Sequence, residues 1–182
     1  EDAQRAAFEA ALDKLTAAGT HVEHRAVPAV ANAMALTGAL YAPEAYGLWK
    51  DVIEAAPEKM FAEILERFRG GAEVCAPDYV AAWAELERLR RVYYEETAGY
   101  DAVIMPASPI LPPNIARLQS EHDYYVARNL LALRNTRIGN LMGAASLTLP
   151  TAAPSCGRML VTPPQSEERL LRIGRAVEAA LT

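Results

Sequence analysis

Apolar positions recur every three or four residues through much of this chain, which is the spacing that places them on one face of a helix. Gly19 ends the first such pattern, and a Gly-Gly pair at 70–71 ends another. The predicted helices span residues 2–18, two or three short segments within 30–49, and then 57–68, 77–98, 121–143 with a break near 137–139, and 166–181.

Four shorter segments have the apolar pattern of β-strands. The predicted strands span residues 20–27, 102–105, 145–150 and 158–162. The last two are bounded by Gly and Pro, which is typical of strands covered on both faces. Residues 108–113 contain three prolines and are predicted to form a loop at the rim of the sheet.

This order of helices and strands favours a layered α/β fold with a mixed sheet. The chain has 182 residues, which suffice for one domain with a sizeable core. No repeat, low-complexity tract or charged linker divides it, so we expect residues 1–182 to form a single α/β domain or a fragment of one. The helical pattern begins at Glu1 without a preceding cap, which favours a fragment.

Charge and cysteine content narrow the classes of partner. A net charge of −5 without a cluster of Lys and Arg gives no electrostatic basis for binding nucleic acid or an anionic membrane surface. No apolar run approaches the ~20 residues that a membrane span needs. Cys75 and Cys156 are the two cysteines and lie far apart, so reduced thiols in a cytoplasmic protein are expected.

The sequence contains few patterns that indicate chemistry. It lacks a Gly-x-Ser-x-Gly elbow, a Gly-rich phosphate loop and a His-Glu-x-x-His pair. His21, His24 and His122 have no predictable further ligand, so we expect neither a metal nor a cofactor. Three candidate nucleophiles lack a predictable base that would activate them. They are Ser108, Ser146 and Cys156.

Arginines form the remaining candidates for binding. Arg88 and Arg90 could clamp a substrate carboxylate, but such a cluster is more often the solvated face of a helix. Arg134 and Arg137 flank Thr136 within an otherwise apolar segment. A structural role and a role in binding both stay open for these two.

Two blocks of sequence resemble a known family. The first consists of Thr136, the Asn-Leu-x-Gly sequence at 140–143, a strand ending at Pro150, and Gly157 before another apolar strand. The second block, residues 100–109, has the form YDxxxxPxxP. In this order, with a helical spacer, the blocks are similar to the C-terminal part of the amidase signature family of serine amide hydrolases.

The resemblance implies a layered α/β/α fold with a mixed sheet and a reaction at amide bonds. Members of this family use a serine nucleophile, a second serine preceded by a cis peptide bond, and a lysine, all in the N-terminal half. This sequence contains no Gly-Gly-Ser-Ser-Gly-like run. The resemblance therefore implies a C-terminal portion that carries no catalytic residue and is inactive alone, with the missing N-terminal half of the same protein as its partner.

The same resemblance suggests which residues line or support a substrate pocket, and the parent protein would take a small amide. These candidates are Met105, Ser108, Arg134, Thr136 and Asn140. The strand faces meant for the missing half would be exposed, and self-association through such apolar surface is expected.

The chain also departs from one branch of the family. The amidase subunit of tRNA-dependent amidotransferases has an Asp shortly before the Thr-containing motif, where this chain has Leu133 and Arg134. Ile138 and Gly139 replace the usual Pro before Asn-Leu. These departures favour amide hydrolysis over transfer of nitrogen from glutamine. The alternative interpretation is a non-catalytic α/β module for binding or scaffolding.

Overall fold

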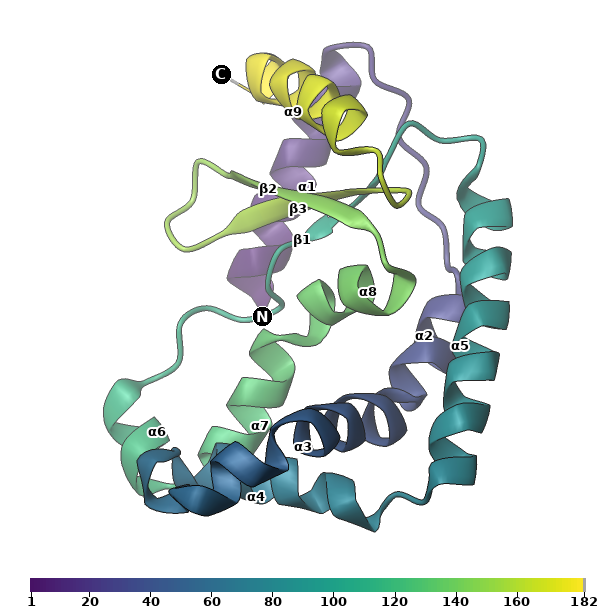
Figure 1. Cartoon of the computed structure of the whole chain (residues 1–182). Helices are drawn as coiled ribbons and strands as arrows, with labels where there is room; N and C mark the ends of the chain where they lie inside the picture. The colour runs from purple at the N-terminus through teal and green to yellow at the C-terminus, as the bar shows by residue number, and fades with distance from the viewer. Residues whose placement is uncertain (182) are drawn as a thin grey trace. The chain divides into compact units, whose positions relative to one another are not determined.

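The chain folds into two compact units in a computed structural model that describes residues 1–181 (Figure 1). The first unit combines Glu1–Val27 with the chain from Tyr94 onward and contains the β-sheet. The second unit, Pro28–Tyr93, is helical. The expectation of a single domain over residues 1–182 stays a prediction.

The sheet of the first unit has three described strands. They are β1 (Val103–Pro106), β2 (Ala145–Pro150) and β3 (Gly157–Thr162), in the order β1-β3-β2. Both outer strands pair antiparallel with β3. The α/β class is therefore confirmed, and the parallel pairing that a mixed sheet also requires does not occur among these three strands.

Burial along the strands follows their place in the sheet. In the central strand β3, every residue from Arg158 to Thr162 is buried, as the continuous apolar run predicts. In the outer strand β2, buried Ala145 and Leu149 alternate with exposed Ser146 and Thr148. The prediction of two covered faces is thus confirmed for β3 and is wrong for β2, because an outer strand here has one face open.

Two helices pack on one face of the sheet, α1 (Asp2–Ala17) and α9 (Glu167–Leu181), and both are visible beside the strands in Figure 1. Leu149, Leu160 and Leu170 form the core of this layer, with Ile173 and Val177 of α9 packed against it. The apolar face of α9 therefore provides the cover that the sheet requires.

The predicted strand over residues 20–27 is wrong, because this segment has no strand pairing. Its side chains are exposed except for the half-buried Val22 and Val27. The Tyr100 hydroxyl donates a hydrogen bond to the Glu23 carboxylate, which tethers the segment. An alternating pattern indicates a strand only where a neighbouring strand is available to pair with it.

The helical region over residues 121–143 is divided at a different point from the one predicted. It forms α7 (His122–Ala132) and α8 (Arg134–Met142), so the break lies at Leu133 and not at 137–139. Gly139 lies inside α8 because the helix packs against β2, where a Cβ would stand 2.8 Å from the Ser146 Oγ. Gly143 ends α8 in the left-handed conformation, with φ of 64°.

The second unit is built from helices that approach each other closely. They are α2 (Pro28–Ala35), α3 (Thr37–Ala55), η1 (Pro57–Lys59), α4 (Ala62–Arg69), η2 (Gly70–Glu73) and most of α5 (Ala76–Thr97). The helix α3 continues through Pro43. Gly71 of η2 lies against the backbone of Ala42 in α3. None of the helices in the described part of the chain is long and apolar enough to cross a membrane.

Candidate functional site

The sequence candidates lie around the end of β1, the loop 107–114 and the helix α8. Met105 is half-buried on β1 opposite Met159 of β3. Ser108 follows the strand by two residues. Arg134 begins α8, and Thr136 and Asn140 follow on the same helix. The first unit therefore contains all five candidates.

Ser108 is engaged within its own loop. Its Oγ donates to the carbonyl oxygen of Ile110 at 2.9 Å and accepts from the Ile110 N–H at 3.3 Å. Both bonds close a tight turn of the kind that serine favours. A nucleophilic serine needs a base within hydrogen-bond reach, and these partners are backbone groups. Ser108 thus shapes the loop.

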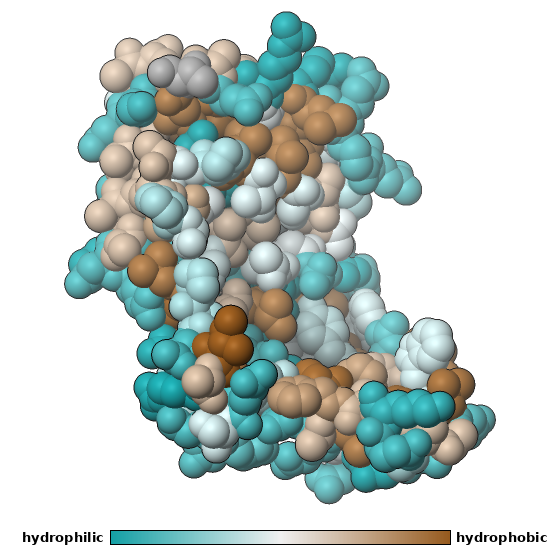
Figure 2. Space-filling model, turned by 90° about the vertical axis from the view of Figure 1, so that its left-hand side faces the viewer, coloured by the Kyte–Doolittle hydropathy of each residue, from teal (hydrophilic) through white to brown (hydrophobic). Residues whose placement is uncertain are grey.

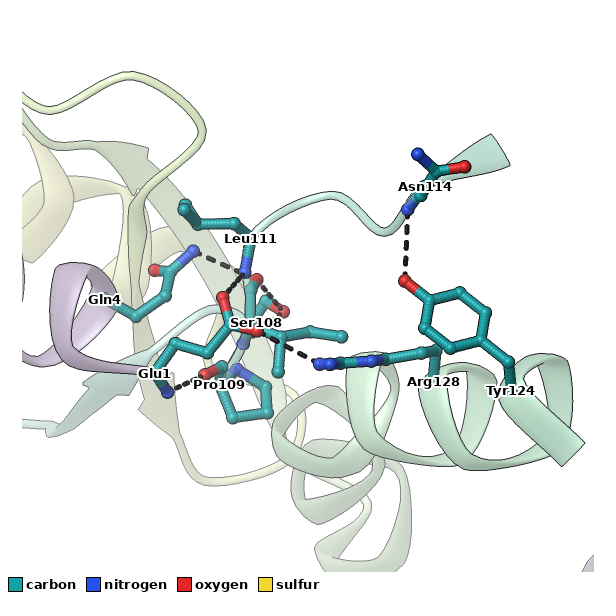
Figure 3. Close-up of polar contacts among 9 residues, drawn as sticks. Glu1, Gln4, Ser108, Pro109, Leu111, Asn114, Tyr124 and Arg128 are labelled. Carbon is teal, nitrogen blue, oxygen red and sulfur yellow. Dashed lines mark hydrogen bonds and ion pairs between the residues drawn. The ribbon is translucent and has the colours of Figure 1, made fainter. Parts of the chain in front are cut away.

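The amino-terminal end of α1 holds the loop from one side (Figure 3). The Glu1 carboxylate accepts from the Leu111 N–H and from Arg128, each at 3.0 Å. The Leu111 N–H lowers the pKa of the Glu1 carboxylate, and Arg128 acts in the same direction. Gln4 Nε2 donates to the carbonyl oxygens of Ile110 and Ser155, so it joins the loop to the β2–β3 turn.

The far end of the loop is fixed to α7. The Asn114 N–H donates to the Tyr124 hydroxyl at 3.2 Å, and both residues appear in Figure 3. Asn114 also caps α6 (Ile115–Ser120) by accepting from the Arg117 N–H. The guanidinium of Arg117 stacks over the Tyr124 ring at 4.0 Å. The loop is therefore anchored at both ends and can present a defined wall.

Asn135 connects α8 to the end of β1. Its side chain is 7% exposed, and Nδ2 donates to the Pro106 carbonyl oxygen at 2.7 Å. Arg134 Nε donates to the Asn135 Oδ1 at 3.3 Å. Asn135 was not predicted from the sequence, although its spacing from the buried Gly139 and Met142 places all three on one helix face. That spacing is the signal that could have found it.

Thr136 and Asn140 lie on the opposite, exposed side of α8. They are four residues apart and so are neighbours on the helix surface. The Thr136 hydroxyl donates to the Leu133 carbonyl oxygen at 3.2 Å, which bridges the break between α7 and α8. The structure thus brings Arg134 to the end of β1 through Asn135, whereas Thr136 and Asn140 face away. Their role in a pocket stays a prediction.

The described residues offer binding groups at this site and no activated nucleophile. Cys156 is buried, and its Sγ lies 3.9 Å from the Ala3 carbonyl oxygen. No group of three His, Cys, Asp or Glu side chains that could hold a metal occurs within residues 1–181. The arrangement can therefore orient a ligand through Arg134 and backbone carbonyls, and the chemical step requires groups from elsewhere.

Comparisons with known proteins agree with this geometry. A family model described as Amidase matches residues 1–171. A curated relative, the 2-amino-5-chloromuconic acid deaminase of Comamonas testosteroni, is 29% identical over 97% of this chain and 39% of its own length.

Solved structures share the fold. A crystal structure of an amidase superimposes with a TM-score of 0.82 at 23% identity, over 98% of this chain and 42% of that one. The 6-aminohexanoate cyclic dimer hydrolase in complex with substrate gives 0.76 at 19% identity, over 97% and 41%. A glutamyl-tRNA(Gln) amidotransferase subunit from Thermotoga maritima gives 0.65 at 22%, over 98% and 39%. The chain spans about two fifths of the length of these relatives.

Proposed function

Since the chain belongs to the Amidase family, whose model matches residues 1–171, we propose that it is the C-terminal portion of a hydrolase that cleaves the carbon–nitrogen bond of a small amide. The family match over most of the chain is the observation that carries this proposal. The name of the relative from Comamonas testosteroni, a deaminase, supports a reaction at a carbon–nitrogen bond.

In this proposal the rest of the protein supplies the serine, the second serine and the lysine. The sequence contains no Gly/Ser-rich run that could hold them, and Ser108 bonds to backbone groups of its own loop. Without an activated nucleophile and an oxyanion hole, nothing lowers the barrier by the ~8 kcal/mol or more that enzymes typically supply. Residues 1–182 alone are therefore inactive.

The chain contributes one wall of the substrate pocket. Asn135 holds the start of α8 against Pro106, which sets Arg134 beside the end of β1. A guanidinium at this corner can donate to a carbonyl or carboxylate oxygen of a substrate. Leu133 and Arg134 occupy the position where amidotransferase subunits have an Asp, so hydrolysis is favoured over nitrogen transfer.

A chimera tests this proposal. Residues 1–182 replace the matching segment of the Comamonas testosteroni deaminase, and release of ammonia is measured with the substrate in that enzyme's name and with simple amides. We expect the chimera to release ammonia, and the deaminase without its matching segment to release none. The Arg134→Ala chimera should raise KM. A folded chimera without activity would contradict the proposal, as would ammonia release by residues 1–182 alone that a fluorophosphonate blocks.

The alternative, a binding or scaffold module, draws on one feature of the second unit. The α3 side chains of Leu48, Trp49 and Val52 form an exposed apolar stripe, with Leu48 73% exposed. Every large apolar residue exposed in the described part of the chain lies on a helix or beside one, so the expectation of exposed apolar strand faces is wrong. The open face of β2 instead carries Ser146 and Thr148.

Under the main proposal this stripe contacts the missing N-terminal half, and under the alternative it contacts another partner or a second copy. Analytical ultracentrifugation of the purified chain and of Leu48→Glu distinguishes these outcomes. Association that depends on concentration and is abolished by Leu48→Glu, together with an inactive chimera, would favour the scaffold. We propose a cytoplasmic location as well, which fractionation of the producing cell would check.

A further inference from the structure

A cavity of about 360 Å³ lies in the first unit between α1, α9 and the β2–β3 turn. Most of its lining consists of small apolar side chains, with three charged groups among them. The lining residues are Ala7, Ala10, Ala11, Lys14, Pro150, Thr151, Ala152, Ala153, Arg158, Glu178 and Leu181. Its volume is within the range of ~300–1,000 Å³ that is usual for sites of small molecules. In Figure 2 the upper part of the molecule, which carries α9, shows apolar surface bordered by polar groups.

Arg158 is the unusual member of this lining. It is 4% exposed on the central strand β3, and its Nε has no hydrogen-bond partner in the described part of the chain. Burial lowers the pKa of the guanidinium, and the attraction of Glu178 opposes that effect. A buried charge without an acceptor is costly, and native proteins normally satisfy such donors. An acceptor that enters the cavity would meet this need.

The cavity is separate from the site around Met105. Side chains alternate between the faces of a strand, so Met159 points to one face and Arg158 to the other. Met105 pairs with Met159 in the sheet and shares its face. Arg158 instead points to the face that α1 and α9 cover, where it lines the cavity with Lys14 and Glu178. A ligand in this cavity would leave the corner at Arg134 unoccupied.

The charges and walls together define the ligand. Arg158 and Lys14 contribute two positive charges and Glu178 one negative charge, so the excess suits a monoanion. Lys14 lies at the surface, where its Nζ donates to the Leu181 carbonyl oxygen at 3.1 Å. Guanidinium groups bind carboxylates through two parallel hydrogen bonds. We propose that this cavity binds a small organic carboxylate whose apolar body packs against Ala7, Ala11 and Pro150.

Titration with benzoate, followed by calorimetry at neutral pH, tests this proposal. We expect saturable binding of benzoate and no binding of benzyl alcohol, which has the same ring without the charge. Arg158→Met should weaken benzoate binding at least tenfold, because it removes the charge and keeps a side chain of similar length. Glu178→Gln should tighten binding severalfold, because it removes the opposing charge. The matched control is Arg88→Met, which removes an exposed arginine paired with Glu85 and should leave binding unchanged.

A second variant keeps the test informative if Arg158→Met fails to fold. Ala7→Phe, at a half-buried position, would fill the cavity with a ring while the charges remain, and it should abolish benzoate binding. No saturable binding to the folded protein would overturn the proposal, as would benzoate binding that neither variant weakens. The readout is binding and not ammonia release, so its failure is separate from a failure of the proposed amide hydrolysis.

Discussion

Adding one methyl group at Gly71 should destabilise the second unit by about 2–3 kcal/mol. A Cβ at this position would lie 2.2 Å from the Ala42 carbonyl oxygen and 2.6 Å from the Pro43 nitrogen. Ordinary contacts between such atoms are about 3.5–4.0 Å, so the backbones of η2 and α3 would have to separate by about 1 Å or more. Overpacking of this kind costs about 1–3 kcal/mol and occasionally more. A backbone carbonyl cannot rotate away as a side chain can.

The neighbouring glycine provides a matched control. A Cβ at Gly70 would meet no atom within 4 Å, and the backbone there has φ of −57°, which alanine adopts without strain. Gly70→Ala should therefore stabilise the unit by about 0.4–1 kcal/mol, through the lower conformational entropy of the unfolded chain. The two variants add the same methyl group one residue apart, and their stabilities should differ by about 3 kcal/mol.

Urea unfolding followed by tryptophan fluorescence measures this difference. The chain has two tryptophans, Trp49 and Trp83, and both lie in the second unit. The signal therefore reports on the unit that is perturbed. If Gly71→Ala and Gly70→Ala had equal unfolding free energies, the close approach of η2 to α3 would be refuted.

Three further substitutions test other parts of the fold. Asn135→Ala removes the bond to the Pro106 carbonyl oxygen and should lower the unfolding free energy by about 1–3 kcal/mol in thermal denaturation. Leu149→Ala in the sheet core should cost about 2–5 kcal/mol by the same assay, and a smaller loss would contradict the packing of α9 on β2. The hydrogen bond from Arg69 lowers the pKa of Glu54 below its ordinary value of 4.5, so the stabilisation is present above pH 4.5 and is lost as the pH falls through the folded-state pKa. Glu54→Gln should remove this acid sensitivity, which fluorescence-detected unfolding at about pH 7 and about pH 3 would show.

The sequence predicted those elements whose ends carry their own signals. Gly and Pro bound the strands at 145–150 and 157–162, and Gly143 ends α8, so local chemistry locates them. The segment 20–27 was mispredicted because alternation of apolar residues cannot indicate whether a partner strand exists. The break predicted at Gly139 is wrong because the reason for this glycine, the close approach of Ser146, is a tertiary contact.

The candidate site could be predicted only in outline. The resemblance to a family located the end of β1 and the start of α8, and the structure joins them through Asn135 and Pro106. Asn135 itself was missed, because a single polar residue in a helical pattern is usually exposed. Arg158 was missed for a related reason, since a cation within an apolar run indicates burial only when the covering helices are known.

The two outer strands of the sheet both end in proline, and this limits how the sheet can grow. The N–H groups of Ala107 and Thr151, which follow these prolines, donate inward to the β2–β3 turn region, at Gly157 and Cys156. Because successive residues of a strand point their backbone groups in opposite directions, the prolines occupy the outward positions, where they offer no donor. A strand that approaches either margin therefore finds no donor at this end of the sheet. Aggregation by strand addition is disfavoured there, and a productive neighbour must align with the opposite ends of β1 and β2.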